Sequence, residues 1–367
     1  MPALKKIVIQ DFRNIALQEL EFCSNVNCIS GGNGEGKTNL LDAIWYLSMT
    51  KSAFSAADRY NFRHGAAAFA LSGTYSLPGG ASARYSIKVE EGSEKKIFRE
   101  DKPYAKVSEH IGRLPIVMVS PADTSLVSES GDERRRFVNS VLSQMDPQYL
   151  AATVQYNRLL AQRNRLLKDG PADEDLLATF DLRLSSLAAP IFEKRNAFVR
   201  ELLPSVERFY REISGGREDV RIEYRSDLQN GSLEDILRAR REKDRIFKFT
   251  TAGIQRDDFI FSLDGHPIRR CGSQGQQKSF LVALKFAQYE IMTAAYGFPP
   301  ILLLDDLFDK LDMNRVSNLL KMVADSSFGQ IFLTDSNKVR ISAIVDSITS
   351  DRTYFEAEGG AFRKIDE

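Results

Sequence analysis

The stretch Val26-Asn27-Cys28-Ile29-Ser30-Gly31-Gly32-Asn33-Gly34-Glu35-Gly36-Lys37-Thr38 decides the fold. Its first five residues form a short run typical of a strand, and the glycines end that run abruptly. The apolar residues after Thr38 are spaced three and four apart, as in a helix that packs one face on a sheet: Leu40, Leu41, Ile44 and Leu47. A strand, a glycine loop and a helix in this order are the setting of a phosphate-binding loop.

The glycine loop fits the pattern Gly31-x4-Gly36-Lys37-Thr38 in full. Glycines let the backbone curl so that successive N–H groups point at a phosphate, and the start of the helix adds partial positive charge. Lys37 is expected to reach the β and γ phosphates of ATP, and the Thr38 hydroxyl to bind Mg²⁺. The candidate nucleotide-binding residues are Gly31, Gly32, Asn33, Gly34, Glu35, Gly36, Lys37 and Thr38.

Two carboxylates follow an apolar run late in the chain. Ile301 to Leu304 has the pattern of a buried strand, and Asp305 and Asp306 come directly after it. Ligands of an open α/β sheet bind beyond the carboxyl ends of its strands, so both aspartates should lie near the nucleotide. We expect Asp305 to hold Mg²⁺ and Asp306 to orient or deprotonate the attacking water. Without the phosphate loop, the same pattern would equally suit a helix cap or a surface turn.

A second element also suits an anion. The run Ser273-Gln274-Gly275-Gln276-Gln277-Lys278 precedes an apolar helix that contains Phe280, Leu284 and Phe286. Ser273 therefore lies near a helix N-terminus, where backbone N–H groups are available to a negatively charged ligand. A plain capped helix would have the same residues.

The flanking patterns predict an α/β protein with a mixed sheet and an inserted helical arm. Alternation and turn residues over 54–100, then an apolar run at 114–119, indicate strands. The period becomes helical between 124 and 248, and strands are expected again at 247–250, 259–263 and 331–334. The predicted division is 1–123 for the first part of the ATPase domain, 124–246 for the arm and 247–367 for the second part.

Composition excludes several classes. The 367 residues carry 50 Lys+Arg and 50 Asp+Glu, so bulk charge cannot attract a polyanion. The three cysteines are expected to be reduced and the three histidines are not spaced as metal ligands. No apolar run reaches the roughly 18 to 20 residues of a spanning helix, and the first residues turn polar too early for a signal peptide. We expect a soluble cytoplasmic protein that does not contact a membrane.

Local basic clusters are the candidate DNA contacts. Arginines and lysines gather in the expected helical arm and at its base, which suits phosphate-backbone binding, although such runs are also typical of solvated helix faces. The motifs of zinc fingers and helix-turn-helix proteins are not visible, so little sequence readout is expected. The DNA-binding candidates are Arg134, Arg135, Arg136, Arg158, Arg163, Arg165 and Lys168, with further positive charge at Lys194, Arg195, Arg238, Arg240, Arg241, Lys243 and Arg245.

The order of these motifs resembles the RecF family, bacterial DNA-repair ATPases of the ABC/SMC-like class. The resemblance extends over nearly the whole chain. Beyond the phosphate loop and the run ending in Asp305-Asp306, it rests on five stretches: Asp11-Phe12-Arg13-Asn14, Ser120-Pro121-Ala122-Asp123, Glu133-Arg134-Arg135-Arg136-Phe137, Gln162-Arg163-Asn164-Arg165-Leu166-Leu167-Lys168 and Gly253-Ile254-Gln255-Arg256-Asp257-Asp258.

This resemblance implies an ABC-type ATPase head that forms a head-to-head homodimer on ATP. Ser273 and Gly275 of one subunit would cap the γ-phosphate held by Lys37 of the other, and the loop 309–312 would cross the interface. Arg13 and Asn14 would belong to the nucleotide site. The implied activity is a weak, DNA-stimulated ATPase that clamps gapped or junction DNA and promotes recombinase loading during repair and replication restart, with RecR and RecO as partners.

Some residues depart from related patterns. Gln255 stands where the family usually has histidine, and no histidine follows Leu333 to sense the γ-phosphate as in transporter relatives. Asp306 is shorter than the glutamate of many transporter ATPases, which suggests slow turnover.

Two other functions fit parts of the sequence. A phosphate-loop kinase or nucleotidase acting on a small molecule would need a substrate pocket and a lid in place of the Ser273 element. A structural SMC-like protein would need long heptad runs, which are absent between 124 and 248.

Overall fold

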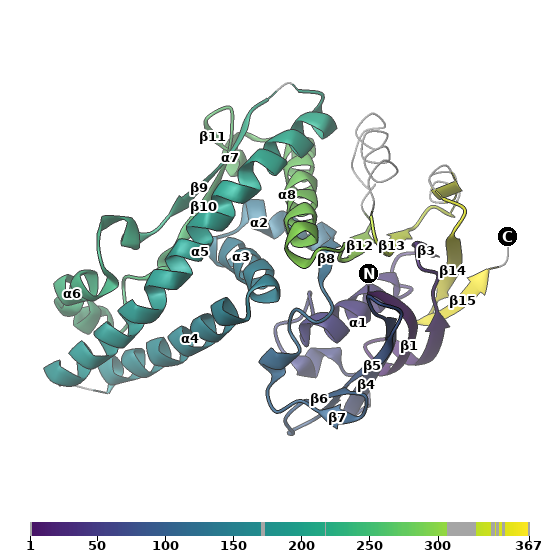
Figure 1. Ribbon diagram of the computed structural model, residues 1–367, viewed down its shortest axis with the longest axis horizontal. Helices are drawn as coiled ribbons and strands as arrows, with labels where there is room; N and C mark the ends of the chain where they lie inside the picture. Colours follow the sequence, from purple (N-terminus) through teal and green to yellow (C-terminus); the bar gives the residue numbers. More distant parts are fainter. Residues whose placement is uncertain are drawn as a thin grey trace. The chain divides into compact units, whose positions relative to one another are not determined.

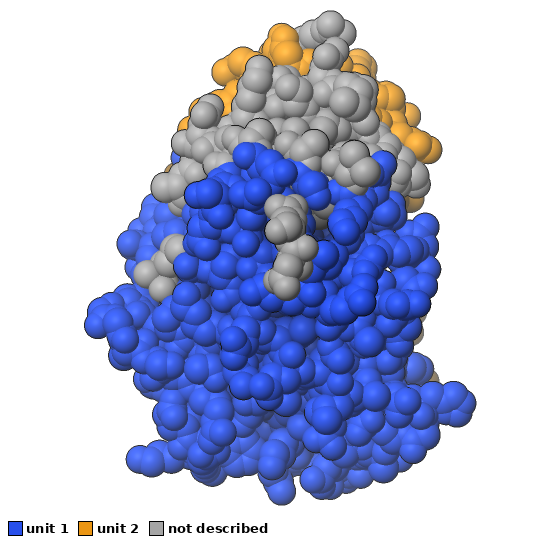
Figure 2. Space-filling model, turned by 90° about the vertical axis from the view of Figure 1, so that its right-hand side faces the viewer, with its two compact units in different colours: residues 1–123, 285–367 blue, residues 124–284 orange. Residues whose placement is uncertain are grey.

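The computed structural model describes residues 2–169, 173–216, 218–306, 328–338, 342, 345–346 and 349–365. The chain divides into two compact units, shown in different colours in Figure 2. Unit 1 comprises residues 1–123 and 285–367, and unit 2 comprises residues 124–284. Unit 2 is thus a continuous insertion within unit 1.

The first sheet of unit 1 is antiparallel. Its six strands lie in the order β2-β1-β4-β5-β6-β7, and most neighbours in the sheet are joined by tight turns. Buried and more exposed side chains alternate along β4 and β5, as expected of a sheet with one covered face. The strands are β1 Ala3–Phe12, β2 Ile15–Glu21, β4 Ala68–Ser76, β5 Ser82–Glu90, β6 Lys96–Arg99 and β7 Lys102–Pro103.

The second sheet of unit 1 has the order β15-β14-β3-β13-β12-β8 and is parallel except for β15. Its central strands are buried along their whole length, which explains their continuous apolar runs. The register places Asp305 beside Thr334 and Asp335 beside Ser30, so β12, β13 and β3 end at one edge. The strands are β3 Val26–Ser30, β8 Ile116–Val119, β12 Ile301–Asp305, β13 Ile331–Asp335, β14 Arg352–Glu358 and β15 Ala361–Ile365.

Helix α1, Lys37–Met49, belongs to the same hydrophobic core as both sheets. The sequence predicted one apolar face, but Ala43, Tyr46 and Met49 are buried as well as the predicted stripe. The helix contacts β1, β4 and β5 of the first sheet and β8, β12 and β13 of the second. A helix covered on two faces must be apolar on both. Its first residues, Lys37 and Thr38, directly follow the glycine loop.

Unit 2 combines helices with a small antiparallel sheet in the order β11-β10-β9. Helices α4 and α5 pack against each other, as Figure 1 shows, and Asp146 and Asp173 cap their N-termini through side-chain oxygens. The elements are α2 Ser125–Ser128, α3 Gly131–Met145, α4 Pro147–Lys168, α5 Glu174–Ser214, β9 Val220–Arg225, α6 Leu233–Phe247, β10 Asp258–Leu263, β11 His266–Pro267 and α7 Ile268–Cys271. Helix α8, Gln274–Tyr296, begins in unit 2.

Short 3-10 helices complete the described elements of both units: Asp58–Asn61, Val107–Glu109, Pro121–Thr124, Asp227–Asn230 and Ile254–Arg256.

An ion-pair cluster lies in the core of unit 2. The guanidinium of Arg163 is fully buried, with Nε 2.8 Å from Asp181 and Nη1 2.7 Å from Asp244. Its Nη1 also donates to the hydroxyl of Thr250 at 2.8 Å. These partners lie on α5, on α6 and just beyond α6, so one arginine of α4 connects three helices.

Several sequence predictions can be compared with these elements. Strands at 26–30, 259–263 and 331–334 are confirmed, as is the helix break after Lys168. The strand predicted at 247–250 is wrong, because Phe247 ends α6 and a turn follows. Strand β9 lies within the segment predicted as helical. Unit 2 continues to residue 284, beyond the predicted arm boundary at 246, because β9 pairs with β10.

Other expectations concern cysteines and membranes. Cys23, Cys28 and Cys271 are not joined in disulfides. Within the described ranges no helix has the length and apolar character needed to span a bilayer.

Candidate nucleotide site

The phosphate loop lies between β3 and α1 in unit 1. Gly36 precedes the helix with φ 103°, a left-handed conformation, and a Cβ at this residue would lie only 2.8 Å from the Asn14 side chain. Glycine meets both constraints because it has no side chain. No side chain caps the N-terminus of α1, so the backbone N–H groups of its first turn are available to a phosphate.

Lys37 is almost completely buried at the base of the loop. Its Nζ donates to the carbonyl oxygens of Gly31 at 2.8 Å and Gly32 at 2.9 Å. The ammonium therefore lies inside the curl of the loop, where a phosphate would be cradled. These carbonyls offset the cost of burying the charge, and phosphate oxygens would be stronger partners.

Asp305 and Thr38 meet at the carboxyl edge of the parallel sheet. The Thr38 hydroxyl lies 3.0 Å and 2.9 Å from the two carboxylate oxygens of Asp305. Thr334, on the neighbouring strand β13, donates its hydroxyl to Asp305 at 2.7 Å. Burial raises the pKa of the Asp305 carboxyl, and the nearby Asp306 carboxylate adds to that effect. No role for Thr334 follows from the sequence pattern, since threonine at a strand end has no distinctive signal.

This pair of side chains fits a magnesium site. Mg²⁺ prefers oxygen ligands and is usually held by one or two protein side chains together with substrate phosphates and waters. Thr38 and Asp305 provide a hydroxyl and a carboxylate side by side, next to the phosphate loop. Within the described ranges no cluster of three or more metal-binding side chains occurs, so a metal here would share its coordination with the nucleotide.

Asp306 directly follows the strand that positions Asp305. Its backbone φ is 42°, an uncommon conformation for a residue other than glycine, and its N–H donates to Thr334 Oγ1 at 3.1 Å. Thr334 thus connects to both aspartates and fixes the turn between them. The Asp306 side chain is half-buried.

The hairpin between β14 and β15 fastens the phosphate loop. The N–H of Gly360 donates to the Glu35 carbonyl at 3.0 Å, and the N–H of Gly359 donates to the Glu35 carboxylate. Asn14 accepts from Asn39 of α1 at 2.7 Å. Glu35 therefore attaches the loop to the hairpin, and its predicted contact with the nucleotide stays a prediction.

Replacing Gly360 with alanine tests this attachment. Gly360 has φ 85°, and its Cβ would collide with the Asn14 backbone, so the hairpin must shift away from the loop. We expect nucleotide affinity to fall by about tenfold, the equivalent of ~1.4 kcal/mol of lost preorganisation. Gly359→Ala is the matched control, because open space surrounds that position and the alanine needs only a left-handed backbone, at about 1–2 kcal/mol of stability. Titration with a fluorescent ATP analogue measures both, and equal affinities would show that the hairpin does not shape the loop.

Arg13 holds helix α1 in place. Its guanidinium forms an ion pair with buried Asp42 at 2.7 Å and donates to Asn39 at 3.2 Å. It also donates to Ser52 and Ser55 beyond the end of the helix, at 3.0 and 3.1 Å. Arg13 and Asn14 both contact Asn39 in the first turn of α1, and their direct binding of a nucleotide stays a prediction.

Ser273 and Gln276 cap helix α8 of unit 2 reciprocally. The Gln276 N–H donates to Ser273 Oγ at 3.3 Å, and the Ser273 N–H donates to Gln276 Oε1 at 2.6 Å. This is a capping box, which leaves Ser273 exposed at the helix start with Gly275 in the first turn. The capped helix start predicted from the sequence is thus present, while its binding of an anion and its role in trans stay predictions.

The seven DNA-binding candidates divide by exposure. Arg136, Arg158, Arg165 and Lys168 are exposed on unit 2. Arg134 forms a two-point ion pair with Asp258, and Arg135 contacts Asp132 and the Asp257 carbonyl. Arg163 is a correction: it is buried in the ion-pair cluster of unit 2, so DNA cannot reach it. Arg195, which the sequence counted in the basic surface, is buried as well, paired with Asp257 at 2.6 Å.

The loop 309–312, which the resemblance places across a dimer interface, lies outside the described residues.

Comparison with known proteins places this site in a class. A family model described as the RecF/RecN/SMC N terminal domain matches residues 3–350. The Smc head domain of Pyrococcus furiosus superposes with a TM-score of 0.57 at 14% identity, covering 100% of this chain and 96% of that one, which shows a shared fold. The fold and the site together define an ATPase head of the ABC type, in the SMC-like class.

Full-length relatives identify the family. The chain is 41% identical over 365 residues to the DNA replication and repair protein RecF of Bacteroides fragilis strain YCH46, covering 99% of each. It is 39% identical over 355 residues to that of Flavobacterium johnsoniae, covering 96% of this chain and 98% of the relative. The chain belongs to the RecF family. A solved structure of the recombination mediator protein RecF with ATP, in the RecFOR pathway, matches with a TM-score of 0.89 at 30% identity, covering 100% of this chain and 98% of that one.

Proposed function

We propose that this protein is a cytoplasmic, ATP-dependent DNA-binding protein of recombinational repair and replication restart. It dimerises on ATP, clamps gapped or junction DNA and promotes recombinase loading, with RecR and RecO as partners. Its ATPase is weak and stimulated by DNA. The observation that carries the proposal is the contact between Thr38 and Asp305 beside a preformed phosphate loop, in a chain that matches ATP-bound RecF over its whole length.

Each residue of the site has a defined task in this proposal. Lys37 exchanges the carbonyls of Gly31 and Gly32 for the β and γ phosphates, and the N-terminus of α1 stabilises their charge. Mg²⁺, held by Thr38 and Asp305, would neutralise charge on the phosphoryl oxygens. Asp306 accepts a proton from the attacking water or orients it.

The dimer requires a contribution from the second subunit. A phosphate loop binds the nucleotide on one face, and the exposed N-terminus of α8 offers N–H donors and the Ser273 hydroxyl to the γ-phosphate of a partner. ADP lacks that phosphate, so hydrolysis removes the group that joins the subunits and releases the DNA. The exposed cations Arg136, Arg158, Arg165 and Lys168 supply backbone contacts with DNA.

Molar mass in solution tests the proposal. Light scattering on the wild type is expected to show a monomer without nucleotide or with ADP, and a dimer with ATP that gapped DNA strengthens. Lys37→Arg removes the fit of the side chain to the loop carbonyls and should stay monomeric with ATP. Ser273→Arg adds bulk and charge at the start of α8 and should bind ATP normally yet fail to dimerise.

Two outcomes would contradict the proposal. A monomer under every condition would end the clamp model and favour a small-molecule kinase or nucleotidase. Full ATP turnover by Ser273→Arg at the DNA-stimulated rate would show that the α8 N-terminus takes no part in catalysis.

A further inference from the structure

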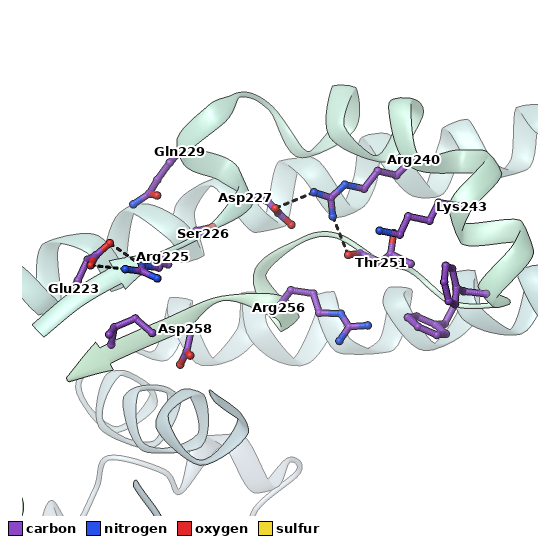
Figure 3. A pocket seen from close by; sticks show the side chains of 13 residues that line it. Glu223, Arg225, Ser226, Asp227, Gln229, Arg240, Lys243, Thr251, Arg256 and Asp258 are labelled. Carbon is purple, nitrogen blue, oxygen red and sulfur yellow. Dashed lines mark hydrogen bonds and ion pairs between the residues drawn. The ribbon is translucent and has the colours of Figure 1, made fainter. Parts of the chain in front are cut away.

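A hollow of about 890 Å³ lies entirely within unit 2, and none of the residues discussed as nucleotide contacts lines it. Its walls come from β9, α6, β10 and the turns between them. In Figure 3, Arg240 and Lys243 reach down from α6, while Arg256 extends from the opposite wall before β10. The volume falls within the range of ligand sites, about 300–1,000 Å³.

The charges in this hollow do not cancel. Its carboxylates are each engaged: Glu223 pairs with Arg225 at 2.8 Å and Asp227 with Arg240 at 3.1 Å, while Asp258 pairs with Arg134 from α3. Lys243 and Arg256 also line the hollow and are exposed, and among the described residues neither has a carboxylate partner. Two uncompensated cations favour an anionic ligand.

Aromatic rings lie beside these cations. Phe247 and Phe249 line the hollow with ring centroids 5.8 Å apart, and the side chain of Phe247 is 53% exposed. The Arg256 guanidinium lies 5.2 Å above the ring of Phe249. A large aromatic residue left in water at the rim of a charged pocket provides a surface on which a planar group can stack.

We propose that this hollow binds a single-stranded segment of nucleic acid, with one base stacked on Phe247 and neighbouring phosphates bound by Lys243 and Arg256. Cations along a groove combined with aromatic platforms are the features of single-strand binding sites, where stacking contributes without regard to base identity. In a duplex the faces of the bases are covered by their neighbours, so a duplex offers this hollow phosphates alone. The site therefore distinguishes a single strand from a duplex.

The inference extends the proposed DNA function, since a gap or junction contains a single strand, but it is tested separately from the ATP-dependent dimer. Two matched pairs of variants carry the test. Phe247→Ala is compared with Ile246→Ala, its exposed neighbour outside the hollow, and Lys243→Gln with Lys248→Gln, an exposed lysine that does not line it. All four side chains are exposed, so folding should be unaffected, and circular dichroism checks this.

Fluorescence anisotropy with a labelled oligonucleotide measures the effect, in single-stranded and blunt duplex forms, without nucleotide. Phe247→Ala should weaken single-strand binding by about tenfold or more, because stacking contributes ~1–3 kcal/mol per base. For single strands, Lys243→Gln should make the slope of log binding constant against log salt concentration shallower by about 0.7. Phe247→Ala should change duplex binding little, because a duplex exposes no base face for stacking, and both controls should resemble the wild type.

Other results would overturn the inference. If the variants lose affinity for duplex and single strand equally, the hollow acts only through its positive charge. If Phe247→Ala loses no affinity for single strands, stacking is excluded. An acidic, phenylalanine-containing peptide that binds the wild type but not the Lys243 variant, with single-strand binding unaltered, would assign the hollow to a protein partner. If the wild type does not dimerise with ATP but Phe247→Ala still weakens single-strand binding, the proposed function is refuted and this inference stands.

Discussion

Arg163→Ala is expected to destabilise unit 2 by about 3–5 kcal/mol, because it leaves the buried Asp244 carboxylate without a counter-ion and leaves buried Asp181 only its 3.1 Å ion pair with Arg241. Asp181 and Asp244 have almost no exposure to water, so they cannot recover their hydration once the guanidinium is gone. The packing of α4 against α5 and α6 should loosen together with the ion pairs. Hydrogen exchange of the amides in α4 and urea unfolding followed by helix circular dichroism measure this loss.

Arg165→Ala is the matched control for that experiment. Arg165 lies two residues further along α4 with its side chain 84% exposed, and its contact with Asp169 is 3.4 Å long. Its replacement should change the free energy of unfolding by no more than about 0.5 kcal/mol. It should instead weaken DNA binding, as expected of a surface phosphate contact. Equal stability of the two variants would show that the Arg163 cluster does not support the arm.

Asp305→Asn is expected to lower ATP turnover by at least about a hundredfold, since a catalytic metal contributes several kcal/mol. The amide keeps an acceptor for the hydroxyls of Thr38 and Thr334, so the fold should persist. EDTA should weaken ATP binding by the wild type and have little further effect on this variant. Phosphate release and titration of a fluorescent ATP analogue provide the measurements.

The same variant should be at least as stable as the wild type without nucleotide. Burial raises the pKa of Asp305 in the folded state, so the unfolded chain loses that proton more readily. The charged carboxylate therefore costs stability as pH rises above the ordinary value of 3.8, and asparagine removes this cost. Relative to the wild type, the free energy of unfolding of Asp305→Asn should increase between pH 4 and 7.

Asp306→Asn separates metal binding from proton transfer. It should lower turnover by about 10²–10⁴-fold, the usual contribution of a general base, while magnesium-dependent ATP binding remains. A variant that loses magnesium dependence would instead place Asp306 in the metal shell, and full activity would exclude its role as a base.

The nucleotide site could be predicted because its signals are local. The glycines between Gly31 and Gly36 and the apolar run before Asp305 each specify a short piece of backbone. The rule that parallel strands end at one edge then brings them together. Thr334 and the hairpin glycines could not be predicted, because they matter only through contacts with neighbouring strands. The sequence pattern does not reveal the order of strands in the sheet.

The helical unit was predicted less well because its charges are decided by distant partners. Arg163 and Arg165 look alike in the sequence, yet only Arg163 faces Asp181 and Asp244, which are 18 and 81 residues away. The run from Phe247 to Thr250 predicts a strand by its aromatic and β-branched residues, whereas Phe247 ends α6 and a turn follows, with Phe247 and Phe249 lining the hollow. Strand propensity is a weak guide to a segment whose conformation is determined by its tertiary contacts.

Strand β3, which leads into the phosphate loop, has consequences for synthesis on the ribosome. Its sheet neighbours are β13 and β14, residues 331–335 and 352–358, so the strand made among the first thirty residues waits for about three hundred more before it can pair. Unit 2 is continuous in the chain and can fold during that interval. Pairings this distant are slow to form, so a nascent chain acquires its ATP pocket last.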